Sequence, residues 1–316
     1  MPGARAPKSS PQKEARALEI TKEQAEAAFK HCVEMIKKHD VDSYLTLLVM
    51  PNKVQPQIAA IMALNVELAT IRDKVTIQGN DTSALYRLQF WREAVQAIYG
   101  QEQGKHVPRQ PAAIALCAFA PNANPFLLES LISARQGTIG DKPFSNVIEL
   151  ENYGKSTTGA LIRLQCEAFR EKSPSADENP VLIEVAEQIG ASYAIANLLR
   201  STLPLLTRRV VLLPRDALSH HSVTPDNVYS KKKPDDLRKV VKDLCLRSEQ
   251  LYSEASKLGR KLNRQERLPV ASFGARIDYI LNTLEKRDYD IYSPYLQRRN
   301  PFFIWSLLLR RVSGYI

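Results

Sequence analysis

The sequence predicts an all-α protein, and three features of the chain support this fold class. Apolar residues recur at helical spacing, at i, i+3, i+4 and i+7, over most of the chain. The run Val210 to Leu213 is the only strand-like stretch of sequence, and it is too short to build a sheet. With 316 residues, of which 44% are hydrophobic, the chain can bury a sizeable core.

The first helix is expected to begin after Thr21, which forms a capping-box pattern with Gln24. A second helix is expected to begin near Pro56, and a third to end before Gly100. The apolar positions of these three helices are Phe29, Cys32, Val33 and Ile36; then Ile58, Ile61, Met62, Leu68 and Val75; then Leu85, Leu88, Trp91, Val95 and Ile98.

Two proline-containing stretches, Gly100 to Pro111 and Glu171 to Pro180, are expected to be loops between helices and not domain boundaries. We therefore expect residues 20–316 to form one domain. The basic stretch 1–19 is either a disordered tail or part of a mitochondrial presequence. Further helical patterns cover Ser145 to Arg170, Pro180 to Leu206, Asp235 to Leu262 and Val270 to Arg287.

The segment Pro301 to Leu309 is apolar, contains Trp305 and is followed by the pair Arg310-Arg311. Its length is too short for a transmembrane helix, which needs about 20 residues. Two interpretations remain open: a helix lying at a membrane surface, or the last helix of the core, which we favour because an all-α domain needs such helices.

The chain carries 44 Lys and Arg against 34 Asp and Glu, a net charge of +10. Such a surplus favours anionic partners such as phospholipid headgroups, nucleic acid or an acidic protein. Aromatic residues do not alternate with the basic clusters, so we expect no stacking platform for single-stranded nucleic acid. The four cysteines, which form no Cys-x-x-Cys pair, are expected to be reduced core residues of an intracellular protein: Cys32, Cys117, Cys166 and Cys245.

The histidines show no spacing typical of metal ligands. His31 and His39 are too far apart for adjacent helical turns. His220 and His221 are neighbours, and we expect their side chains to point in opposing directions. Solvated or capping histidines are therefore expected, and not metal ligation.

The most informative segment runs from Ile189 to Pro214. It resembles the second signature of the squalene/phytoene synthase family, in which Asn-x-Leu-Arg is followed by Asp-x-x-x-Asp, a basic turn and an apolar run ending in Leu-Pro. Here Ser201 and Leu205 occupy the two aspartate positions. The frame around them is kept by Asn197, Leu199, Arg200, Arg208, Leu213 and Pro214.

The first signature of that family is an aspartate-rich helix, roughly Ala-Phe-x-x-Glu-x-Asp-Asp-x-x-Asp. The corresponding run, Ala63 to Asp73, keeps Glu67 but retains Asp73 as its single aspartate. The resemblance spans about residues 40–295 and implies an isoprenoid (terpenoid) synthase-like helical bundle. Its further matches, in the same order along the chain, are Arg87 to Arg92, Leu150 to Tyr153 and Ala275 to Asp290.

In that family, the missing carboxylates hold the Mg²⁺ ions that neutralise a departing diphosphate. A serine hydroxyl is a poor ligand for Mg²⁺, and leucine offers no oxygen. We therefore predict a pseudoenzyme with no catalytic residue, no metal and no cofactor, which does not use prenyl diphosphate. The former substrate pocket is predicted to retain Glu67, Asp73, Asn197 and Arg200, with Arg200 either contacting an anionic group or pairing with Glu67 or Asp73.

Within the family, the chain most resembles a mitochondrial group that acts in the assembly of respiratory complex I. The phrase Asn65-Val66-Glu67-Leu68-Ala69, in place of the aspartate-rich helix, is the most specific match. The resemblance implies a chaperone-like assembly factor on the matrix side of the inner membrane, in peripheral contact with it. Its implied partners are complex I subunits or other assembly factors, and not nucleic acid.

Two alternatives remain. One is an active isoprenoid or lipid transferase with atypical metal ligands. The other is a basic helical module that binds membranes or RNA, for which binding would depend steeply on salt.

Overall fold

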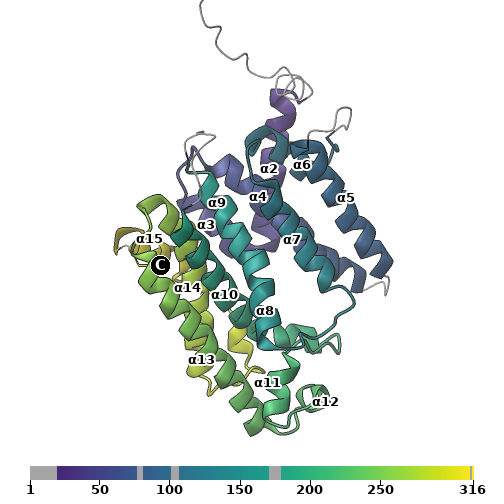
Figure 1. Ribbon diagram of the computed structural model, residues 1–316, viewed down its shortest axis with the longest axis vertical. Coiled ribbons are helices and arrows are strands. Elements are labelled where there is room, and N and C mark those ends of the chain that lie inside the picture. The colour runs from purple at the N-terminus through teal and green to yellow at the C-terminus, as the bar shows by residue number, and fades with distance from the viewer. Residues whose placement is uncertain (1–19, 77–80, 101–106, 171–178, 314) are drawn as a thin grey trace, which may run out of the picture.

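A computed structural model describes residues 20–76, 81–100, 107–170, 179–313 and 315–316, and for residues 72–76 it gives the backbone only. These described residues form helices and connecting segments, with no β-strand among them (Figure 1). The all-α prediction is confirmed. Val210 to Leu213, the strand-like run, is a connecting segment without a strand partner in the described chain. The basic stretch 1–19 and most of the two predicted loops lie outside the described residues.

The first half of the chain contains six described helices. The predicted capping box at Thr21 is present: its hydroxyl accepts from the Gln24 backbone N–H at 3.2 Å, and the Gln24 side chain accepts from the Thr21 N–H at 3.0 Å. Of the predicted apolar positions, Leu85 is 42% exposed and does not join the core. The side chain of Val75 is outside the description. The helices are α2 (Lys22–His39), α3 (Val41–Val49), α4 (Gln55–Thr76), α5 (Asp81–Tyr99), α6 (Pro111–Phe119) and α7 (Pro125–Gly137).

The second half contains the long helices that the sequence predicted and several short ones that it did not. The stretch predicted as one helix from Ser145 to Arg170 is interrupted by a π-helical turn, η1. Short helices carry too few repeats to be read from periodicity. The elements are α8 (Val147–Gly154), η1 (Lys155–Gly159), α9 (Ala160–Glu167), α10 (Pro180–Leu206), α11 (Arg215–His220), α12 (Pro225–Tyr229), α13 (Pro234–Gly259), α14 (Arg264–Glu285), η2 (Pro294–Gln297) and α15 (Phe303–Ser313).

Helix α10 packs against α8, η1, α13 and α14 (Figure 1). Glycines allow its closest approach to a neighbour. A Cβ added at Gly190 of α10 would lie 2.5 Å from the carbonyl oxygen of Gly154 and 2.6 Å from the backbone nitrogen of Gly159. Because real Cβ atoms do not come this close to other atoms, no larger residue fits at Gly190 without a shift of the backbone.

The C-terminal helix α15 packs against α14 and α3. Phe303 and Leu307 are buried in this contact, whereas Trp305 is 65% and Leu309 69% exposed. The helix therefore has one face in the core, as the favoured interpretation required, and one apolar face in solvent. Among the described helices, none combines the length and the apolar character needed to cross a bilayer.

Three of the four cysteines, Cys32, Cys166 and Cys245, are buried, and none of the four forms a disulfide. Burial raises the pKa of the Cys32 and Cys245 thiols to about 12. The described cysteines are thus thiols of the core, as predicted.

Candidate functional site

A cavity of about 520 Å³ lies among the helices of the fold. Its lining comes mainly from α3, α4, α7, α8, η1, α10 and α14, with single residues from α2, α5 and α9. This volume falls in the range typical of small-molecule sites, about 300–1,000 Å³. Apolar side chains supply much of the lining, among them Val66, Leu68, Leu150, Leu161, Leu198 and Phe273.

Among the described residues, four cationic side chains also line the cavity: Arg135 of α7, Lys142, Arg200 of α10 and Arg276 of α14. Arg135 donates hydrogen bonds to Asn65 Oδ1 and to the Leu131 carbonyl oxygen. In the described part of the chain, no carboxylate pairs with it. Burial lowers the pKa of Arg135, because its charge is poorly solvated there. A guanidinium in this setting favours an anionic ligand.

Arg276 is 5% exposed. It donates to the hydroxyls of Ser43 and Thr46, both at 3.3 Å, and its guanidinium carbon lies 4.7 Å from the ring centroid of Phe273. Its Nε atom has no hydrogen-bond partner in the described structure. Burial is the largest influence and acts to lower the pKa of Arg276, but Asp40, Tyr193 and Asp42 together outweigh it, so that the pKa is raised. The charge of Arg276 is thus stabilised by the protein while one of its donors stays unused.

The α10 wall contains the residues of the second sequence signature. Asn197, Arg200, Ser201 and Leu205 all line the cavity, as the resemblance implied for the first two. Arg200 donates to Asn197 Oδ1 at 2.8 Å. The Ser201 hydroxyl donates to the Leu198 carbonyl oxygen at 3.1 Å, which ties it to its own helix. The two aspartate positions of the family therefore face the cavity without offering a carboxylate.

The facing wall, from α4, differs from the expectation. Asn65, Ala69 and Thr70 line the cavity, but Glu67 does not. The Glu67 carboxylate accepts a hydrogen bond from Gln110 Nε2 at 3.1 Å and lines a separate surface depression. Positions two apart on a helix differ by about 200°, which turns Glu67 away from both Asn65 and Ala69. Arg200 does not pair with Glu67, which was one of the alternatives left open for it, and the side chain of Asp73 lies outside the described residues.

The described residues of the cavity do not fit a Mg²⁺ cluster of the family type. Among the described lining residues, the carboxylates are Asp40 and Asp42, at the start of α3. Asp40 caps that helix, where it accepts from the Ser43 N–H at 3.0 Å and from the Ser43 hydroxyl at 2.6 Å. Described side chains of α4 and α10 bring no carboxylate to the cavity, so they offer no carboxylate ligand to a Mg²⁺ ion between these helices.

Arg135 and Arg276 were not among the predicted pocket residues, although a signal for them exists in the sequence. Arg276 follows Phe273 by three residues and precedes Ile280 by four, which places it on the apolar face of its helix. Arg135 follows Leu131 by four residues and Ile132 by three, which places it on the same helix face as these apolar residues. An arginine in the apolar phase of a helix indicates a buried charge with a specific role.

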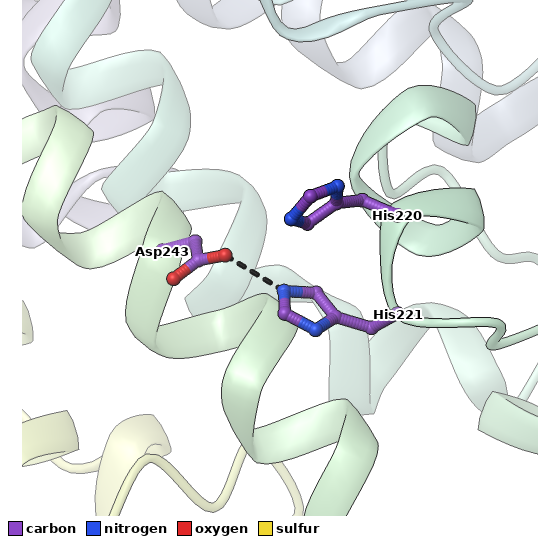
Figure 2. Close-up of side chains that lie close together, drawn as sticks. All are labelled: His220, His221 and Asp243. Carbon is purple, nitrogen blue, oxygen red and sulfur yellow. Dashed lines mark hydrogen bonds and ion pairs between the residues drawn. The ribbon is translucent and has the colours of Figure 1, made fainter.

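A second cluster lies apart from the cavity, between the end of α11 and α13 (Figure 2). The rings of His220 and His221 have centroids 4.8 Å apart, and His221 Nε2 lies 2.7 Å from Asp243 Oδ2. The expectation that the two histidines point in opposing directions is wrong. Opposite directions hold for neighbours in a strand, whereas neighbours at a helix end differ by about 100° and can turn toward a common point.

The chain is similar to known proteins over most of its length. The family model of squalene/phytoene synthase matches residues 36–305. The mouse protein named NADH dehydrogenase (ubiquinone) complex I, assembly factor 6, is 30% identical over 282 residues, which cover 89% of this chain and 80% of the mouse protein. The cattle protein of the same name is 31% identical over 288 residues, covering 89% and 81%.

The fold is also found in solved structures. A crystal structure of a dehydrosqualene synthase in complex with ligand superposes with a TM-score of 0.74, at 18% identity, over 92% of this chain and 98% of that one. This likeness shows that the helical bundle has the isoprenoid synthase fold.

Proposed function

Because the chain belongs to the squalene/phytoene synthase family, we propose that it is a non-catalytic member that helps to assemble mitochondrial respiratory complex I. The observation that carries the proposal is twofold. Relatives named as complex I assembly factors match 89% of the chain, and the cavity of the fold lacks carboxylates on the described parts of its α4 and α10 walls.

The proposed lack of catalysis follows from the chemistry of the cavity. Prenyl transfer needs charge neutralisation on a departing diphosphate, which Mg²⁺ supplies when carboxylates hold it. The Ser201 hydroxyl donates to the Leu198 carbonyl oxygen and the Leu205 side chain has no ligand atom, so these side chains cannot hold the ion. The cations that remain bind an anion but do not replace a metal cluster in ionising a diphosphate.

In the proposed mechanism, the cavity is a binding site whose ligand is an anionic group carried by a lipid or by a protein segment. Arg135, Lys142, Arg200 and Arg276 supply positive charge, and the apolar lining accepts a chain or side chains. The unused Nε donor of Arg276 and the lack of a carboxylate partner for Arg135 among the described residues leave donor capacity for such a group.

We place the protein on the matrix side of the inner membrane, in peripheral contact through α15. Trp305, Leu309 and Val312 are exposed on this helix next to the basic Arg311, and the exposed Phe302 directly precedes the helix. An apolar face with Trp and flanking arginines is the composition of a helix that lies in a lipid interface. The double variant Trp305→Ser/Leu309→Ser should keep its urea unfolding curve but lose sedimentation with anionic vesicles. Unchanged sedimentation would remove α15 from the proposal.

The assembly role is tested in a strain of the source organism from which the gene is deleted. Native gels should show loss of assembled complex I, restored by the wild-type chain and by Ser201→Ala. Ser201→Ala removes the hydroxyl that stands at a family metal position, so full rescue separates assembly from any chemistry there. Normal complex I in the deletion strain would contradict the proposal.

A second assay addresses the transferase alternative directly. The purified chain is incubated with farnesyl or geranylgeranyl diphosphate and Mg²⁺, and pyrophosphate release is measured. We expect release no faster than in a sample without protein. Mg²⁺-dependent release that scales with protein concentration would show that the chain is an enzyme with other ligands.

A further inference from the structure

We propose that His220, His221 and Asp243 form a binding site for a divalent transition-metal ion, best matched by Zn²⁺. The candidate ligand atoms of the three residues all lie within 4.8 Å of one another. They come from two elements that pack together, the end of α11 and the middle of α13 (Figure 2). The site is separate from the cavity and does not depend on the proposed role in complex I assembly.

The donor set is one that zinc uses. Two imidazoles and one carboxylate, with the fourth position left to solvent, is the ligand set of open zinc sites in proteins. Zinc ligands at 2.0–2.2 Å from the ion are about 3.3 Å apart in tetrahedral geometry, so the side chains must close in by about 1.5 Å at most. The Asp243 side chain is 55% exposed and His220 is exposed, which leaves these side chains free to rotate.

Asp243 is available as a ligand because its cationic neighbours on α13 are engaged elsewhere. Lys239, one turn before it, pairs with Asp236 at 2.9 Å. Arg247, one turn after it, makes two hydrogen bonds to the Glu151 carboxylate, at 2.7 and 3.0 Å. In the described structure, the ion pair of Asp243 is with His221.

His220 points into the same space without a hydrogen bond of its own. Its ring meets the His221 ring at 83° and makes no hydrogen bond to any other described residue. The nearby cation Lys233 is engaged elsewhere, because its ammonium group donates to the Ser222 carbonyl oxygen at 2.9 Å. The imidazole nitrogens of His220 are therefore open to a ligand from solvent.

A bound ion would fasten α11 to α13. Helix α11 is six residues long and follows the segment 207–214, which supplies Leu212 to the cavity wall. Zinc at the end of α11 would restrict this segment at its C-terminal side. We therefore expect zinc to slow backbone hydrogen exchange in residues 207–221 of the folded chain.

The test uses the full chain without an affinity tag. Zn²⁺ is titrated in competition with a chromophoric chelator, and Co²⁺ is added separately to record the absorption of a tetrahedral site. We expect one saturable Zn²⁺ per chain, with affinity lowered at least tenfold by each of His220→Ala, His221→Ala and Asp243→Asn. His31→Ala, which removes an exposed imidazole on α2, is the matched control and should change the affinity less than twofold.

Each variant is also unfolded in urea without metal, so that a folding defect is recognised. His220→Ala removes no hydrogen bond of the described structure and should fold like the wild type. The proposal is overturned if no saturable binding occurs, if His220→Ala binds as the wild type does, or if His31→Ala weakens binding equally. Binding of Zn²⁺ without slower exchange in residues 207–221 would overturn the link to the cavity wall.

Discussion

The two halves of α10 differ in what they tolerate. Around Gly190 the helix meets α8 and η1 so closely that an added Cβ would lie 2.5 Å from the Gly154 carbonyl oxygen. About three turns later, the same helix presents Ser201 and Leu205 to a cavity of about 520 Å³. The first half is fixed by backbone contacts. The second half borders a cavity, where one side chain can replace another without moving the helix.

This difference explains how the fold of the family can be kept when its metal-binding carboxylates are not. Helix position is set where backbones touch, because a change there must move a whole helix. Metal ligands in a cavity contribute little to the position of the helix that carries them. The carboxylates of the family can therefore be lost at positions 201 and 205 while Gly154, Gly159 and Gly190 hold α10 in place.

The largest expected effect on the free energy of unfolding comes from a substitution at Gly190, in the tightly packed half of α10. Gly190→Ala should lower the free energy of unfolding by about 2–3 kcal/mol, because the new methyl group collides with the backbone of α8 and η1. Urea unfolding followed by circular dichroism measures it. Gly137→Ala is the control: its Cβ would meet nothing within 4 Å, and we expect no loss or a gain of up to about 1 kcal/mol. Equal curves for both variants would refute the contrast.

A smaller effect is expected from placing aspartates at positions 201 and 205, in the half of α10 that borders the cavity. Ser201→Asp/Leu205→Asp should lower the free energy of unfolding by about 1–2 kcal/mol, since two like charges one turn apart repel and apolar contact is lost. We expect no Mg²⁺-dependent pyrophosphate release, because α4 still faces them with Asn65 and Ala69. Ser201→Asn/Leu205→Asn gives the matching shape without charge. Prenyl transfer by the aspartate variant alone would show that two carboxylates are enough.

The smallest effect on stability is expected at Arg135. Arg135→Met removes a poorly solvated charge that has no carboxylate partner in the described chain, so the free energy of unfolding should stay within about 1 kcal/mol. The rescue of complex I in the deletion strain should nevertheless fall, because the anionic ligand loses its contact. Lys38→Met removes an exposed charge on α2 and should change neither the free energy of unfolding nor the rescue of complex I. Full rescue by Arg135→Met would mean that the cavity charge is not used.

The sequence predicted the helices that local signals define. Thr21 with Gln24 marked the start of α2, and Pro180 that of α10, because caps and proline act over a few residues. The side of a helix that faces the cavity depends on tertiary packing. Glu67 was predicted at the pocket from its match in the chain, but the phase of α4 turns it toward Gln110. Arg135 shares a helical phase with Leu131 and Ile132, but its helix was not among those predicted, and its contact with Asn65 depends on the fold.

The π-helical turn η1 has a consequence for insertions and deletions. It carries one residue more than a regular helix would between α8 and α9, and Thr157 and Thr158 of this turn face the cavity. Deleting one residue between 155 and 159 would let the three elements fuse into one continuous α-helix. Because the wide turn absorbs the extra residue, Leu161 and Leu164 of α9 would keep their direction toward the core. The backbone around Thr157 and Thr158 would tighten, and this would change the cavity wall. This segment can therefore lose one residue at the cavity without turning α9 out of the core.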